Sequence, residues 1–197
     1  MAFFGQRLIN NPATHSAATD QYLVALAVSS QDTAAFGELI RRHQSQVRNF
    51  LRKLSGDTSS ADDLAQDCFL HAWNKLQTFT GRGSFIGWLL KVAYTTFLQS
   101  KRRSKRYAEI LDEAGYVEDV QNKSYTVQSD EVTDLDKFLA VLNEEERAIM
   151  IMSYACGLSH REIGVATDLP VGTVKSIIFR GKNKIRTSFD IKDHKHG

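Results

Sequence analysis

Residues 157–180 read GLSHREIGVATDLPVGTVKSIIFR, and this stretch decides the expected fold. Gly157 is typical of the end of a helix, and Ser159 with Glu162 matches a capping box at the start of a short second helix. After a turn, Pro170 stands at the first position of a third helix, where its missing N–H costs nothing. Two short helices joined by a tight turn predict a helix-turn-helix.

The last helix of this motif has an apolar stripe formed by Val174, Ile178 and Ile185. Donor groups near a helix N-terminus can read base edges while flanking cations hold phosphates. An ordinary solvated helical face would look the same, so the pattern alone leaves DNA binding and a plain helical bundle both open. The side chains away from the stripe are Lys175, Ser176, Phe179, Arg180, Asn183 and Arg186.

Upstream of the motif, apolar residues recur at helical spacing almost throughout, and only Pro12 and Pro170 are prolines. One apolar stripe runs over residues 36–54. A second helix follows, for which Ser60 is the expected cap, and a third is expected over about 85–103. The sequence therefore predicts an all-α fold.

The net charge of +2 hides a basic, acidic, basic arrangement along the chain. A basic run over 101–106 is followed by an acidic stretch with weak periodicity, which we interpret as a linker between two small helical domains. The expected division is an N-terminal lead 1–19, a first domain 20–106, a linker 107–132, a second domain 133–190 and a tail 191–197.

The third predicted helix mixes aromatic rings with cations, a combination that can stack bases and follow phosphates of single-stranded nucleic acid. For each ring taken singly, a core position is the better interpretation. The predicted second helix carries Asp62, Asp63, Gln66 and Asp67 on one side, with no histidine or second carboxylate placed opposite. We therefore expect a protein-docking face there and no metal site.

Other features narrow the class of protein. Cys68 and Cys156 are far apart without metal-type spacing, which fits free thiols in a reducing cytosol. No signal peptide and no run of about 20 apolar residues is evident, so we expect a cytoplasmic protein that is not membrane-inserted. The six histidines are scattered, and no catalytic or metal constellation accompanies them, so we expect no enzyme and no cofactor.

Several motifs resemble one family, the bacterial sigma factors of the extracytoplasmic-function (ECF) type, over about residues 20–188. In the first domain the resemblance rests on residues 61–73, ADDLAQDCFLHAW, then on Phe79, Gly81, Phe85, Gly87-Trp88-Leu89 and Lys101-Arg102-Arg103. In the second it rests on Gly157-Leu158-Ser159 and on residues 170–176, PVGTVKS.

The resemblance implies roles for the first domain, sigma region 2. Its acidic second helix would dock on the clamp helices of the largest polymerase subunit, through Asp63, Gln66 and Asp67. The loop 77–84 and the next helix would open the promoter −10 element and hold a flipped base, and a pocket for that base would offset part of the unstacking cost. The residues expected at the −10 element are Phe79, Trp88, Lys91, Thr95, Arg102 and Arg103.

For the second domain, sigma region 4, the resemblance implies recognition of the duplex −35 element. Lys175, Ser176, Phe179 and Arg180 would read it, with Arg161 and Thr173 near phosphates. The linker would occupy the polymerase channel that later carries RNA. The implied partners are core RNA polymerase (clamp helices and flap), promoter DNA and an anti-sigma factor, with no small-molecule substrate. A stress or envelope response is the implied setting.

Some residues depart from the family pattern. Ile177 stands where Arg is common, which either removes a DNA contact or places an apolar side chain against a partner. Gly181 replaces the usual Ala at a cost of about 1 kcal/mol of helix propensity. Thr95 and Arg82 also differ, which leaves the promoter sequence open.

Two other classes of function compete with a sigma factor. A stand-alone DNA-binding regulator would not need the motifs of residues 61–73 and 87–89 together. A nuclease or deaminase would need a zinc signature or clustered carboxylates with a base, which the sequence lacks.

Overall fold

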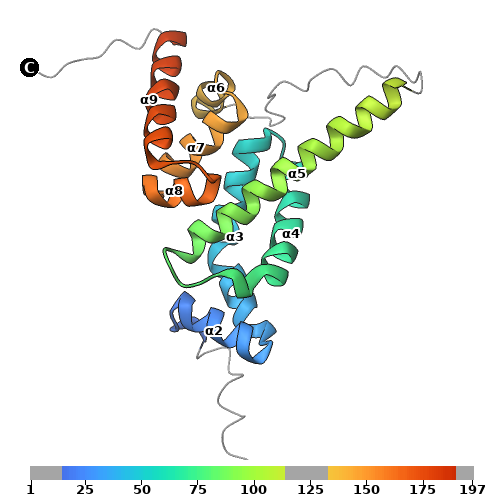
Figure 1. Ribbon diagram of the computed structural model, residues 1–197, viewed down its shortest axis with the longest axis vertical. Coiled ribbons are helices and arrows are strands. Elements are labelled where there is room, and N and C mark those ends of the chain that lie inside the picture. The colour runs from blue at the N-terminus through green and yellow to red at the C-terminus, as the bar shows by residue number, and fades with distance from the viewer. Residues whose placement is uncertain (1–14, 114–132, 190–197) are drawn as a thin grey trace, which may run out of the picture.

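The computed structural model describes residues 15–113 and 133–189, and within these ranges every regular element is a helix (Figure 1). The expected all-α fold is therefore confirmed. Residues 1–14, 114–132 and 190–197 lie outside the described residues, which removes most of the expected lead 1–19, most of the expected linker 107–132 and all of the expected tail 191–197 from the description.

The first helical unit brings four α-helices and one short 3₁₀ turn together. The amphipathic helix α3 is its centre, because its buried face, including Leu39, Val47 and Phe50, packs against α2, α4 and α5. The elements are α2 (Asp20–Ser30), α3 (Thr33–Ser55), α4 (Thr58–Lys75), η1 (Leu76–Thr78) and α5 (Phe85–Glu113).

The cap of α4 differs from the expectation. Asp57 is the N-cap residue, and its carboxylate accepts from the backbone N–H groups of Ser59 and Ser60. Ser60 lies inside the first turn and donates its hydroxyl to Asp57. The prediction of Ser60 as the cap was wrong because Asp57 is also a strong capping residue, and it follows directly on Gly56, where α3 ends.

Helix α5 is longer than expected. It continues to Glu113 and projects away from the rest of the molecule, as its yellow-green end in Figure 1 shows. Residues 104–113 include good helix formers and an i,i+4 pair between Lys105 and Glu109, 3.8 Å apart. The predicted end near residue 103 was therefore too early.

The second unit contains the helix-turn-helix. The capping box between Ser159 and Glu162 is confirmed at the start of α8, and Asp168 ends that helix in the left-handed conformation, with φ 57°. Pro170 is the N-cap of the next helix, one position before the predicted one. The elements are α6 (Asp134–Ala140), α7 (Glu144–Tyr154), α8 (His160–Thr167) and α9 (Val171–Ser188).

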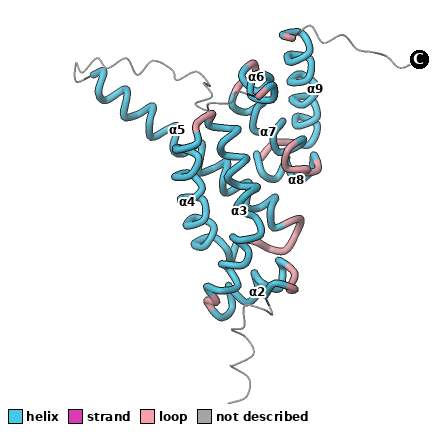
Figure 2. The backbone as a smooth tube through the Cα atoms, turned by 180° about the vertical axis from the view of Figure 1, so that it is seen from behind, coloured by secondary structure: helices cyan, strands magenta, loops and turns pink. Residues whose placement is uncertain are grey.

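The two units pack against each other, with α7 beside α3 and α8 beside α5 (Figures 1 and 2). The buried Arg147 joins them: its guanidinium donates to the carbonyl oxygens of Leu139 (3.0 Å) and Leu142 (2.8 Å) in its own unit and of Leu54 (3.3 Å) in α3. Buried apolar side chains of both units belong to one continuous core.

Candidate nucleic-acid interface

Helix α9 presents a polar face to solvent. Its buried positions are Val174, Ile177, Ile178 and Gly181, so the residues between them point outward. Four of the residues predicted to read the −35 element are exposed there. Phe179 is 65% exposed to solvent, although its side chain is aromatic. These four are Lys175, Ser176, Phe179 and Arg180.

The two departures on α9 have structural reasons. Ile177 is only 2% exposed and packs in the core of its own unit, so it contacts neither solvent nor an external partner. A Cβ atom at position 181 would lie 3.3 Å from the sulfur of Met150, so Gly181 allows α9 to approach α7 closely. Both residues therefore help to position α9, which carries the polar face.

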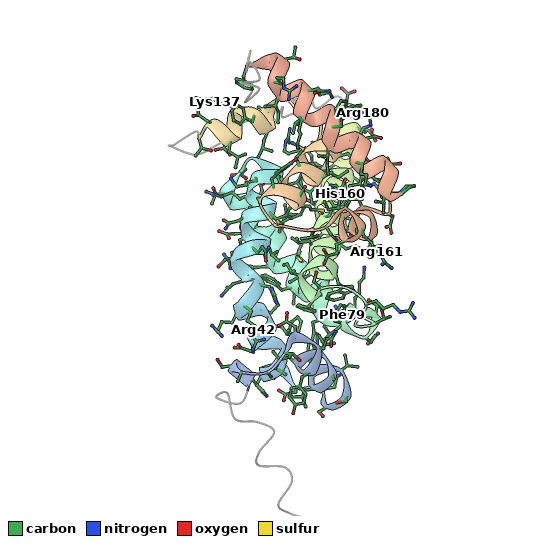
Figure 3. The ribbon with its side chains drawn as sticks, turned by 90° about the vertical axis from the view of Figure 1, so that its left-hand side faces the viewer. Arg42, Phe79, Lys137, His160, Arg161 and Arg180 are labelled. Atoms are coloured by element: carbon green, nitrogen blue, oxygen red, sulfur yellow. The ribbon has the colours of Figure 1, made fainter. Side chains whose placement is uncertain are left out.

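The flanking contacts predicted for phosphates come from two helices. Arg161 is exposed in the first turn of α8, and Thr173 is half-buried in the first turn of α9. Figure 3 shows Arg161 below Arg180 on the same side of the molecule.

Nearby, burial alone would raise the pKa of Glu146, but the hydrogen bonds from Lys184 and the Asn143 backbone N–H outweigh it and lower that pKa.

The aromatic residues predicted at the −10 element form one cluster. The ring centroid of Phe79 lies 5.5 Å from that of Phe85 and 5.9 Å from that of Trp88. Phe85 is buried, whereas Phe79 and Trp88 are half-buried, and the Trp88 indole N–H donates to the Thr78 hydroxyl. Phe79 and Trp88 therefore each pack against the core and remain partly exposed to solvent.

The polar residues predicted on α5 have different surroundings. The Lys91 ammonium lies 2.5 Å from the Asp168 carboxylate of the second unit. The Thr95 hydroxyl donates to the Lys91 carbonyl oxygen. Arg102 and Arg103 are exposed, at the start of the projecting part of α5.

The predicted docking residues lie on α4. Asp63 and Gln66 are exposed and Asp67 is half-buried, so the three form an accessible acidic surface. Asp62, next to them, is paired with Arg48 of α3 at 2.6 Å. This pair leaves the other carboxylates of the face available to a partner.

The sequence did not predict one pocket of the structure. It has a volume of about 490 Å³ and lies between α2 and the loop that follows η1, where the Gln21 amide donates to the Gly81 carbonyl oxygen at 3.3 Å. No sequence signal could reveal it, because α2 and this loop lie about 60 residues apart along the chain. Its lining residues are Gln21, Val24, Ala25, Val28, Ser29, Gln77, Phe79, Thr80 and Gly81.

Arg42 anchors the start of α2, the helix that forms one side of this pocket. Its guanidinium donates to the carbonyl oxygens of His15, Ser16 and Ala18 and forms an ion pair with Asp20 at 3.0 Å. The same side chain, together with Arg41, also binds the Glu38 carboxylate. The start of α2 is therefore fixed to α3 by charge-assisted hydrogen bonds.

Within the described ranges, no three His, Cys, Asp or Glu side chains are grouped so that they could hold a metal ion. In the same ranges no helix has both the length and the apolar character that a membrane span requires.

Comparison with known proteins agrees with this arrangement. The family model "Sigma-70 region 2" matches residues 39–107, and "Sigma-70, region 4" matches residues 133–185. The two matches cover the first and second helical units in this order. Together they define the sigma-70 class of transcription factor, a class of regulatory proteins.

Several curated relatives carry the same class name. An ECF RNA polymerase sigma factor SigE of Mycolicibacterium smegmatis is 33% identical over 77% of this chain, which spans 60% of that protein. The ECF RNA polymerase sigma-E factor of Escherichia coli is 29% identical over 85% of this chain and 92% of its own length.

A solved structure gives the same relationship. The sigma factor RpoE of Bartonella quintana, in complex with the anti-sigma factor NepR, superimposes with a TM-score of 0.64 at 26% identity, covering 80% of this chain and 98% of that one. The chain belongs to the sigma-70 family, as an RNA polymerase sigma factor of the ECF type, which serves promoter-specific initiation of transcription.

Proposed function

We propose that this protein binds core RNA polymerase through the Asp63, Gln66 and Asp67 face of α4 and acts in the cytoplasm without catalysing a reaction itself. Asp63 and Asp67 are accessible on this face, and the neighbouring Asp62 is paired with Arg48 within the chain. Accessible carboxylates support a docking role for this face. Within the initiation complex, region 2 would comprise residues 20–106 and region 4 residues 133–190, joined by the linker 107–132.

The exposed face of α9 carries the proposal for the −35 element. Four outward residues in the first three turns of the helix meet the geometric need of major-groove recognition, and Phe179 is exposed although its side chain is a large apolar ring. Arg161 and Thr173 lie where they would contact phosphates. Lys175, Ser176, Phe179 and Arg180 would read the bases.

The aromatic cluster and the neighbouring pocket support the proposal for the −10 element. An unpaired base needs a ring to stack on and space beside that ring, and Phe79 both belongs to the aromatic cluster and lines the open pocket. Trp88, Lys91 and Thr95 would hold the opened strand, and Arg102 and Arg103 would neutralise phosphates. The solved Bartonella relative was captured with an anti-sigma factor, and we propose that a protein of that class also controls this chain.

Run-off transcription with core polymerase and genomic promoter fragments tests this function. The protein should direct initiation, and Arg180→Ala should weaken it about 5- to 150-fold, since a specific base contact contributes about 1–3 kcal/mol. Asp67→Arg should abolish it by repelling the docking partner.

Matched controls keep this experiment specific. Lys137→Ala removes an exposed cation on α6, and Asp134→Arg reverses an exposed acid on the same helix, and both variants should initiate normally. Duplex binding without any polymerase-dependent initiation would instead identify a stand-alone regulator.

A further inference from the structure

The last turns of α5 stand clear of the other helices. In Figures 1 and 2 this end of the helix projects away from every other labelled helix. From Arg102 to Asp112 all side chains are exposed except those of Ala108 and Leu111, which are half-buried. Tyr107 is 64% and Ile110 55% exposed, so two large side chains with apolar surface face solvent about one turn apart.

The exposed residues of this segment divide between two sides of the helix. At about 100° per residue, five of them fall within an arc of about 140°, which we call the Arg–Tyr–Ile face. This face consists of Arg102, Arg103, Arg106, Tyr107 and Ile110. Outside the arc lie Lys105, Glu109 and Asp112. The arginines are therefore gathered on one side of the helix, and the carboxylates of Glu109 and Asp112 lie off that side.

The cations of the face have no counterpart within the described residues. Lys101 is paired with Glu144 at 2.8 Å, and Lys105 lies 3.8 Å from Glu109. No carboxylate of the described ranges forms a salt bridge with the three arginines of the face. Three guanidinium groups are therefore free to bind a partner, and they surround an exposed aromatic ring and an aliphatic side chain.

This combination fits double-stranded nucleic acid. Arginine binds phosphates through paired hydrogen bonds, so three free guanidinium groups favour a polyanion. A standard protein interface buries about 1,600 Å², far more than two apolar side chains on one helix can supply. A single strand needs a groove lined by several rings, whereas a projecting helix is convex and matches the major groove of a duplex.

The length and position of the face also suit a duplex. Residues 102–110 span about 12 Å along the helix axis at about 1.5 Å per residue, close to the width of the major groove. The face begins at Arg102 and Arg103, which the proposed function places at the −10 element. The duplex that adjoins this element is the DNA between the −10 and −35 elements.

We propose that the Arg–Tyr–Ile face binds the double-stranded promoter DNA between the −10 and −35 elements, as a third contact beside the two elements themselves. Arg106 binds phosphates, and Tyr107 and Ile110 contact base edges, where an apolar side chain can meet a thymine methyl group. The inference rests on the proposed function, because the face reaches this DNA only if Arg102 and Arg103 lie beside the −10 element.

Two neighbouring cations provide a matched test. Arg106 lies on the face and Lys105 outside it, so Arg106→Ala and Lys105→Ala remove the same charge from adjacent exposed positions. Alanine favours a helix, so both variants should fold, which circular dichroism checks. Each full-length variant is assembled with core polymerase and bound, over a series of salt concentrations, to a labelled promoter fragment that supports run-off initiation.

The two sides of the helix should respond differently. Arg106→Ala should weaken binding at least about threefold and lower the slope of log K against log salt concentration by about one, because one phosphate contact is lost. Lys105→Ala should change the affinity by less than about twofold. The Tyr107→Ala, Ile110→Ala double variant should bind at least about threefold more weakly with an unchanged salt slope, because it removes no charge.

A shortened fragment identifies the DNA segment that is bound. Fork DNA cut at the upstream edge of the −10 element keeps the opened strand but lacks the duplex between the two elements. On this DNA, Arg106→Ala should bind within about twofold of the unmodified chain, since its partner phosphates are absent. Arg102→Ala should remain weaker on both fragments, because that residue contacts the −10 element itself.

Other results overturn the inference. An equal loss with Lys105→Ala would show a diffuse charge attraction, and a loss with Arg106→Ala that persists on the shortened fragment would show binding of the opened strand. Weaker co-elution of Arg106→Ala with core polymerase would identify a protein contact. If Arg106→Ala alone is neutral, only this inference falls. If the unmodified chain fails to initiate, or Arg102→Ala is neutral, the proposed function falls and the inference falls with it.

Discussion

At the residue scale, Ile177 shows how one side chain can exchange a DNA contact for packing. The resemblance would place an arginine there, yet the position is 2% exposed. Ile177→Arg should lower the free energy of unfolding by about 3 kcal/mol or more, because it buries a charge without a partner. Urea unfolding followed by circular dichroism measures this loss.

A conservative change provides the control. Ile177→Leu keeps the apolar volume and should cost less than about 1.5 kcal/mol. A stable Ile177→Arg variant with improved −35 binding would contradict the inward packing of this residue.

Glu38 makes acid stability another residue-scale property. Hydrogen bonds from Arg41 and Arg42 lower the pKa of Glu38 from 4.5 to about 2 in the folded protein. Its stabilising contribution is therefore fully present above about pH 4.5 and is lost as the pH falls toward 2. The difference in urea midpoint between the unmodified chain and Glu38→Gln should shrink over that range.

The exposed Glu109, which lies 3.8 Å from Lys105, serves as the control position for this substitution. Its replacement by Gln should shift the urea midpoint little, because an exposed ion pair contributes little to stability. A Glu38 difference that stayed constant down to pH 2 would contradict the assigned ion pairs.

At the element scale, two glycines of the helix-turn-helix should respond in opposite directions to alanine. A Cβ at position 164 would lie 2.8 Å from the Leu169 carbonyl oxygen, which belongs to the turn and cannot easily move. Gly164→Ala should therefore destabilise the protein by about 1–3 kcal/mol. A Cβ at position 172 meets no atom within 4 Å, so Gly172→Ala should stabilise α9 by up to about 1 kcal/mol.

Thermal unfolding of the two variants, compared with the unmodified chain, checks this pair. Equal and favourable effects at both positions would show that α8 and the turn do not approach as closely as described.

At the scale of the whole molecule, the shared core predicts that the two units unfold together. Both tryptophans, Trp73 and Trp88, lie in the first unit, so their fluorescence reports that unit, whereas circular dichroism reports all helices. The two signals should give coincident denaturation curves. Gly164→Ala, although in the second unit, should shift the fluorescence curve as well.

Separate transitions, with fluorescence unaffected by Gly164→Ala, would show that the units are energetically independent.

The local rules of the sequence were sufficient for the fold class and the helix-turn-helix. The Ser159 and Glu162 capping box and the end of α8 depend on residues within a few positions of each other, so they can be read directly from the chain. The same rules misplaced the cap of α4 and the end of α5. There, several neighbouring residues satisfy the local requirement, and only the folded chain selects among them.

The amino-acid sequence by itself determined the all-α class, the helix-turn-helix and the polar face of α9. Tertiary structure alone decided that Ile177 points inward, that α2 closes one side of a pocket, and that Lys91 pairs with Asp168, 77 residues away. The physical reason is that such pairings depend on how complementary surfaces fit, and no local periodicity along a chain encodes that fit.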